Sequence, residues 1–200
     1  MAELEELDHG LLVVRAGLRA AGVPSNLLSG ISTRAQRSGR RQTGEFQSNR
    51  EARWKLKPND PQYGTEKDCK TIELRLLGMM CEFVNAPVPD EAVREILSKY
   101  IGHMPVPGTY RDALTLERLD YNDFLDEAGN PIWGRSKFHI GHIDPNQMPR
   151  HTPENISWRT MRSNLIQGDQ TLREARAKFV ELIGRYFDLG EVTIHPDEIA

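Results

Sequence analysis

The sequence contains only two cysteines, Cys69 and Cys81, and no CxxC pair. They can build neither a disulfide framework nor a cysteine-based zinc site. No apolar run approaches the roughly 20 residues that a membrane-spanning helix needs. The first residues, MAELEELDHGLL, are acidic where a secretory signal would be basic. We therefore expect a cytoplasmic protein with no membrane segment and no structural zinc.

An overall positive charge is also lacking, because the 200 residues carry a formal net charge of −3. This balance argues against indiscriminate binding to polyanions. Basic residues are nevertheless concentrated in residues 32–57, where Glu45 and Glu51 are the acids and the basic residues are Arg34, Arg37, Arg40, Arg41, Arg50, Arg53, Lys55 and Lys57. The segment is equally consistent with a solvated loop and with an arm that contacts phosphates.

The spacing of apolar residues divides the chain into two parts. Steps of three and four predict helices at 4–18, 65–85, 90–101 and 171–187, whereas residues 25–64 show no sustained period and are predicted to be loop, with a short helix near 50–54. After residue 105 the pattern favours strands, at FHIGHIDP (138–145) and at 155–158. We therefore expect an α+β protein with a mainly helical region at 1–105 and a second region at 106–200.

Histidines and asparagines cluster in the second region. His139, His142 and His151 fall within 13 residues and are followed by Asn155 and Asn164. An imidazole can accept a proton from water near neutral pH, and an amide oxygen can bind a hard cation such as Mg²⁺. These groups together could hydrolyse a phosphodiester. His139 and His142 alone are also consistent with two structural strand histidines or an HxxH zinc pair.

The segments HIGHIDP, PENISW and RSNLIQGD resemble, in their order and spacing, the HNH (ββα-metal) nuclease motif. The resemblance is close over 138–172 and looser from Tyr110 onward. It implies a ββα-metal fold for the second region, in which His142 is the general base and Asn164 binds the metal ion. It also implies that Asn155 holds the intervening loop closed through backbone hydrogen bonds, which keeps His142 aimed.

Two features depart from the commonest form of that motif. Gly141 stands where an aspartate usually ligates the metal, which is similar to the DRGH signature of nonspecific ββα-metal nucleases. His139 would then take the aspartate's place, either as a second metal ligand, as a group that orients a water, or as a hydrogen-bonding neighbour. The expected ion is Mg²⁺, with Mn²⁺ or another divalent transition metal able to substitute. The cysteines that tie the preceding hairpin through zinc in many family members are absent from Tyr110–Phe124, so we expect apolar packing to replace them.

The segment TYRDALTLERLDYNDF followed by FHIGHIDP resembles HNH-type restriction endonucleases. The resemblance implies a type II restriction enzyme that cuts double-stranded DNA, as a homodimer if the recognition site is palindromic, with the helical region serving recognition or dimerisation. Another HNH enzyme (homing, mobile-element or nonspecific defence nuclease) is the alternative. A DNA-binding regulator with an inactive ββα unit is a further alternative.

The sequence also predicts which arginines contact DNA and where some residues around the motif lie. The arginines expected to contact DNA phosphates are Arg34, Arg37, Arg40 and Arg41 in the basic segment and Arg150, Arg159 and Arg162 around the motif. Ordinary solvated charge is an equally good interpretation of any one of them. We expect His151 to be a surface residue, Asp144 to organise a turn, and Trp158 to fill the core beneath the motif.

Overall fold

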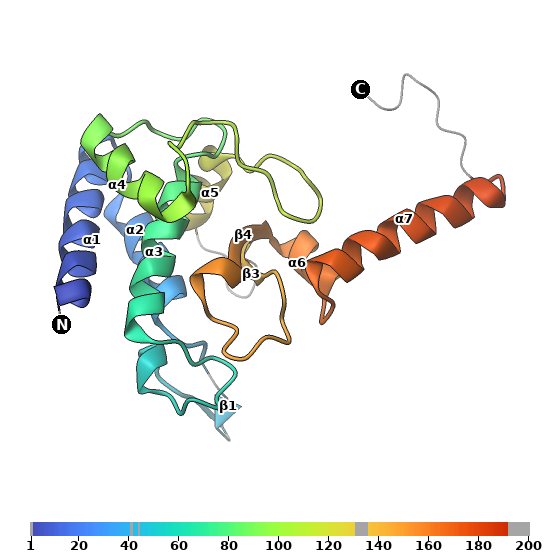
Figure 1. Ribbon diagram of the computed structural model, residues 1–200, viewed down its shortest axis with the longest axis horizontal. Coiled ribbons are helices and arrows are strands. Elements are labelled where there is room, and N and C mark those ends of the chain that lie inside the picture. The colour runs from blue at the N-terminus through green and yellow to red at the C-terminus, as the bar shows by residue number, and fades with distance from the viewer. Residues whose placement is uncertain (1, 41, 44, 131–135, 192–200) are drawn as a thin grey trace.

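The computed structural model describes residues 2–40, 42–43, 45–130 and 136–191, which form a mainly helical α+β fold (Figure 1). The elements follow in the order α1 (Ala2–Ala20), α2 (Ser25–Gln36), β1 (Gln42–Thr43), β2 (Phe46–Gln47), η1 (Arg53–Lys55), α3 (Glu66–Met80), α4 (Glu91–Ile101), α5 (Tyr121–Gly129), β3 (Phe138–His142), η2 (Pro153–Asn155), β4 (Ile156–Thr160), α6 (Met161–Gln167) and α7 (Leu172–Asp188). The predicted class is confirmed: a helical first half precedes a two-stranded hairpin followed by helices.

Helix α3 forms the centre of the helical part. Residues around most of its circumference are buried, and it packs against α1, α2, α4 and β4. It begins where Thr65 Oγ1 accepts the backbone N–H of Asp68 at 3.1 Å. Helix α4 ends at Gly102, whose φ of 87° is a left-handed conformation that glycine adopts at low cost. The predicted helices at 4–18, 65–85 and 90–101 are confirmed, although α3 ends at Met80.

The prediction of loop over residues 25–64 is wrong for α2, whereas the short helix predicted near 50–54 is present as η1. Helix α2 buries Leu27, Leu28, Ile31 and Ala35 against the core, and its serines, asparagine and glycine obscure this helical spacing in the sequence. The chain then forms the antiparallel β1–β2 hairpin, closed at its base by a 2.8 Å hydrogen bond from Ser38 N to Glu51 O. The basic segment is therefore folded back on itself instead of extending as a free arm. Helix α5 was also not predicted.

Strands β3 and β4 pair antiparallel, from Phe138 opposite Thr160 to His142 opposite Ile156. Alternate residues point to opposite faces, so Phe138 and Ile140 lie on one face with Trp158. That face packs on the helical part, where Phe138 stacks near Phe83 and the Trp158 indole N–H donates to the Leu76 carbonyl at 2.9 Å. Trp158 is fully buried as predicted, and such a side chain contributes about 3–5 kcal/mol relative to alanine.

The main hydrophobic cluster includes residues from both sides of the expected boundary between 105 and 106. The hairpin thus shares its core with the helices that precede it. Among the described residues, no helix combines the length and apolar character that crossing a membrane requires.

Candidate active site

The loop between β3 and β4 is closed at its neck by Asn155. The Asn155 side chain accepts the backbone N–H of Asp144 at 2.7 Å and donates to the carbonyls of Asp144 at 2.8 Å and Arg150 at 2.9 Å. The amide is buried, so these bonds are not exchanged with water. They are the backbone contacts expected of this residue. Asp144 in turn accepts the N–H of Asn146 at 2.8 Å, which forms the expected turn.

His142 ends β3, next to this closed neck. Its carbonyl accepts a hydrogen bond from Gln167 Nε2 of α6 at 2.8 Å, which ties the strand end to the helix. Burial, together with the charges of Arg150 and Arg53, lowers the pKa of the His142 imidazole to about 4. The ring is therefore neutral at pH 7, the state in which it can accept a proton from water.

Asn164 lies on α6, on the other side of the same strand end. Its Oδ1 is 3.2 Å from the point where a Cβ on Gly141 would stand, so the amide faces the backbone immediately before His142. In the described part of the chain, no group of three or more histidine, cysteine or acidic side chains is arranged to hold a metal ion. A cation bound by Asn164 Oδ1 would therefore complete its shell with water and phosphate oxygens, as Mg²⁺ commonly does.

The side chains of His142 and Asn164 lie on opposite faces of the β3–β4 hairpin. Gly141 faces α6, and by the alternation of a strand the His142 side chain leaves on the opposite face, toward Arg53 and Arg150. The structure thus brings the two residues to consecutive positions of one strand. That they act on one phosphate and one ion stays a prediction.

His139 is not oriented as a partner of Asn164. Its Nε2 lies 2.9 Å from the Ser136 carbonyl, to which it donates, so the ring turns toward the beginning of β3. Its side chain also borders the basic cleft described below. A metal ligand needs a free nitrogen lone pair, which Nε2 lacks while it carries this proton, so only Nδ1 of His139 could bind an ion. The metal role of His139 stays a prediction.

Gly141 is explained by its neighbour on β4. A Cβ at this position would overlap Cγ of Arg159, which pairs with His139 and lies diagonally across from Gly141 on the same face of the hairpin. The aspartate of the commonest HNH form would meet the same obstacle. The buried position of the Arg159 side chain therefore requires glycine at position 141.

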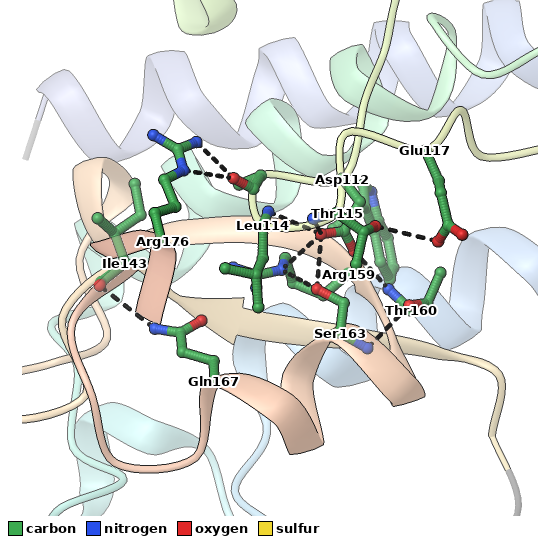
Figure 2. Close-up of polar contacts among 12 residues, drawn as sticks. Asp112, Leu114, Thr115, Glu117, Ile143, Arg159, Thr160, Ser163, Gln167 and Arg176 are labelled. Carbon is green, nitrogen blue, oxygen red and sulfur yellow. Dashed lines mark hydrogen bonds and ion pairs between the residues drawn. The ribbon is translucent and has the colours of Figure 1, made fainter. Parts of the chain in front are cut away.

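Arg159 does not contact phosphate, contrary to prediction, because its side chain is 0% exposed. It lies in a buried polar network with Asp112 and Ser163 (Figure 2). Arg159 Nε is 3.2 Å from Asp112 Oδ1 and donates to Ser163 Oγ at 2.9 Å, and this hydroxyl donates to Asp112 Oδ1 at 2.6 Å. Within the described residues, the two Nη atoms of Arg159 have no hydrogen-bond partner.

Asp112 joins the segment before α5 to the start of α6. It accepts the backbone N–H groups of Leu114 at 2.8 Å, Thr115 at 3.1 Å and Thr160 at 3.0 Å. Burial would raise the pKa of Asp112, but these bonds, the Ser163 hydroxyl and the Arg159 charge outweigh it and hold the pKa below its usual value. Together with the expected apolar packing, in which Leu114, Leu119, Tyr121 and Phe124 are buried, this ionic network fastens the segment before the hairpin.

A basic cleft of about 660 Å³ lies beside β3. Its lining includes Phe138, His139 and Ile140 of the strand, residues of α2, and the arginines Arg34, Arg37, Arg40, Arg50 and Arg53. Arg37 and Arg40 are exposed there, as a phosphate contact requires. Arg34 also forms an ion pair with Glu127 at 2.9 Å, so much of its charge is already compensated. Arg41 lies outside the described residues.

Arg53 and Arg50 were not among the predicted site residues. Arg53 donates to the Gln62 carbonyl at 3.0 Å, which fixes its side chain, and burial lowers its pKa to about 10, still high enough to keep the guanidinium charged at pH 7. The sequence showed that basic residues, including Arg50 and Arg53, are concentrated in residues 32–57. The tertiary fold that places Arg53 near His142, about 90 residues later in the chain, and Arg50 on the cleft lining was not visible in the sequence.

The remaining predicted residues differ in exposure. Arg150 lies beside His142 and its Nε donates to the Pro61 carbonyl at 2.7 Å. Arg162 is exposed on α6. His151 is buried, contrary to prediction: its Nε2 donates to the Ala35 carbonyl at 2.6 Å, and burial together with the Arg53 charge lowers its pKa to about 3. His151 therefore connects the loop to α2.

No protein-family model matches the sequence, and no protein with a curated description matches it. Among solved structures, the fold is similar to that of a type II restriction endonuclease, with a TM-score of 0.51 and 20% sequence identity. The match covers 62% of this chain and 54% of the other, so the chain spans about half the length of that protein. At this identity the likeness concerns the fold.

Proposed function

We propose that the protein is a metal-dependent endonuclease of the HNH type that hydrolyses phosphodiester bonds in double-stranded DNA, and that it acts as a type II restriction enzyme. The observation that carries the proposal is the strand end at residue 142, where a neutral imidazole lies beside Arg53 and Arg150 and an amide oxygen lies across Gly141. The similar fold of a type II restriction endonuclease supports the same class.

In the proposed reaction, His142 accepts a proton from the water that attacks phosphorus. The lowered pKa keeps it unprotonated and ready at neutral pH. Arg53 and Arg150 bind the non-bridging phosphate oxygens, whose charge increases as the water attacks. Asn155 keeps His142 in place by closing the loop that follows it.

Asn164 Oδ1 would hold Mg²⁺, and His139 is not needed as a ligand. A bound divalent cation would stabilise the charge on the phosphate and on the leaving oxygen. The Asn164 amide is neutral, and the described residues contain no group of three or more histidine, cysteine or acidic side chains that could hold a metal ion, so affinity for the cation depends on the DNA phosphate. Metal and DNA should therefore bind cooperatively.

The basic cleft would bind the DNA backbone beside the scissile phosphate. Arg37, Arg40 and Arg50 are exposed on its lining, and backbone contacts of this kind position a duplex without reading its sequence. A chain with net charge −3 carries its positive charge locally, which favours selective over indiscriminate binding.

Cleavage of a mixed-sequence plasmid with Mg²⁺, Mn²⁺ or EDTA tests the proposal. We expect discrete fragments with metal and none with EDTA. His142→Ala should lower the cleavage rate about 10²- to 10⁴-fold while DNA binding persists, and His9→Ala, an exposed histidine of α1, serves as the matched control. Full activity of His142→Ala refutes the mechanism. Smeared products would indicate a nonspecific nuclease, and a gel shift without cleavage a regulator.

A further inference from the structure

Helix α7 carries an apolar face that changes from buried to exposed along its length. In its first turns, Leu172 and Ala175 are buried against Leu114, and Phe179 packs beside them. Arg176 also donates to the Ala113 carbonyl, which anchors this half. Figure 1 shows the helix continuing away from the rest of the fold. The apolar residues of its second half are exposed: Val180, Leu182, Ile183, Tyr186, Phe187 and, just beyond the helix, Leu189.

The exposed residues continue the face that the first half buries. Leu182, Ile183 and Tyr186 follow Phe179 at steps of three and four, the spacing of one helix side. Exposed fractions of 72% for Val180 and 53% for Ile183 and Tyr186 show that, in the part of the chain that the structure describes, little covers them. A contiguous patch of this kind on a soluble protein marks an interaction surface.

Local interactions do not account for the exposed half. Thr171 and Glu174 form a capping box at the start of α7, and Glu181 pairs with Lys178 and Arg185. Pairs of this kind contribute about 0.2–0.5 kcal/mol each. They support the helix, but they give no reason for several large apolar side chains to be on one side of it.

We infer that two copies of this chain associate by antiparallel packing of the second halves of their α7 helices. The charges of the helix favour this occupant. Residues 172–180 contain Arg173, Arg176 and Lys178 against Glu174, whereas residues 181–191 contain Glu181, Asp188 and Glu191 against Arg185. An antiparallel pair brings the basic half of each helix toward the acidic half of the other, and the helix dipoles also oppose. A two-fold axis makes both contacts at once.

The size of the patch is sufficient for such a pair. The six exposed side chains, at roughly 100 Å² each, would bury about 600 Å² per chain, or about 1,200 Å² in total, the lower end of specific interfaces. A membrane surface fits less well, because interfacial helices have Lys and Arg on their polar face and the exposed half of α7 is net acidic. The inference does not depend on the nuclease proposal.

The oligomeric state of the full chain in solution is the direct test. Sedimentation equilibrium should give twice the 22.8 kDa of one chain. Ile183→Asp should raise the dimer dissociation constant at least 100-fold, whereas Ala177→Asp, on the exposed polar side of the same helix, should leave it within about threefold. Unchanged circular dichroism of both variants excludes unfolding. The inference is overturned if the wild-type chain remains monomeric at about 100 µM, a concentration at which even a weak dimer would form. It is also overturned if Ile183→Asp leaves the dimer unaffected.

Cysteine cross-linking tests the orientation. In an antiparallel pair centred near Ile183, a cysteine at 183 lies next to its copy, so Ile183→Cys should form a disulfide-linked dimer on mild oxidation. Leu189→Cys, at the helix end, should not, because its copy lies at the far end of the pair. The two native cysteines are buried and supply a low background. Cross-linking at 189 and not at 183 would contradict antiparallel packing. Binding of the wild-type monomer to phosphatidylcholine–phosphatidylglycerol vesicles would assign the face to membranes.

Discussion

Replacing Asp112 with asparagine should destabilise the protein strongly, because it removes the charge that compensates a fully buried arginine. Asp112 and Arg159 are both 0% exposed, and the two Nη atoms of Arg159 have no hydrogen-bond partner among the described residues. Removing one partner of a buried ion pair costs about 3–5 kcal/mol. Asparagine also has only one acceptor oxygen for the donors that Asp112 now satisfies.

Urea unfolding followed by tryptophan fluorescence measures this loss, since Trp158 is in the core. Glu117→Gln is the matched control, because Glu117 is an exposed carboxylate nearby that accepts the Thr115 hydroxyl at 3.0 Å. It should change the free energy of unfolding by less than about 0.5 kcal/mol. A similar small change for Asp112→Asn would refute the argument from the buried pair.

A double variant separates the charge from the packing. Asp112→Leu combined with Arg159→Met removes both charges, and well-packed apolar replacements of buried ion pairs are often neutral or stabilising. The double variant should therefore recover a large part of the stability that Asp112→Leu loses alone. DNA cleavage should recover less than stability does, because Asp112 also holds Thr160 and Ser163 at the start of α6, which carries Asn164. If the double variant recovers DNA cleavage as fully as it recovers the free energy of unfolding, the network of Asp112, Arg159 and Ser163 contributes to stability alone.

Three further predictions follow from the site. The cleavage rate should stay near its pH 7 value down to about pH 5, since the pKa of His142 is about 4; an acid limb at pH 6.5 would contradict this in a pH–rate profile. The free energy of unfolding should fall as pH drops from about 6.5 to about 3, where unfolded chains protonate His151 and the folded protein does not; His151→Gln should flatten that slope in urea titrations. Arg50→Gln should weaken DNA binding and reduce the salt slope by about 1, measured by fluorescence anisotropy, with Arg19→Gln as control.

The parts of the fold that the sequence predicted are those with a long regular pattern. The helices α1, α3, α4 and α7 show apolar steps of three and four over 11 residues or more. Helix α5 spans only nine residues, and its acidic, aromatic sequence is also typical of turns. Helix α2 was missed because serine, asparagine and glycine are poor helix formers; its burial against α3 outweighs that preference.

The candidate site was predictable only where its residues are close in sequence. The motif spacing placed Asn155 correctly at the neck of the loop. The position of Arg159 beside the motif, by contrast, led to the expectation that it contacts phosphate. In the structure, the second face of the hairpin is also covered, and the partner of Arg159 is Asp112, 47 residues earlier. Contacts over such separations, including that of Arg53 with His142, depend on the tertiary fold.

The shared core has a consequence for protein engineering. The indole of Trp158 is bound to the Leu76 carbonyl, and Phe138 lies against Phe83. A fragment beginning at residue 106 would lose both partners and leave large aromatic surfaces bare. The segment that we propose to be catalytic is thus not an independent folding unit: a fusion to another domain would have to include α3.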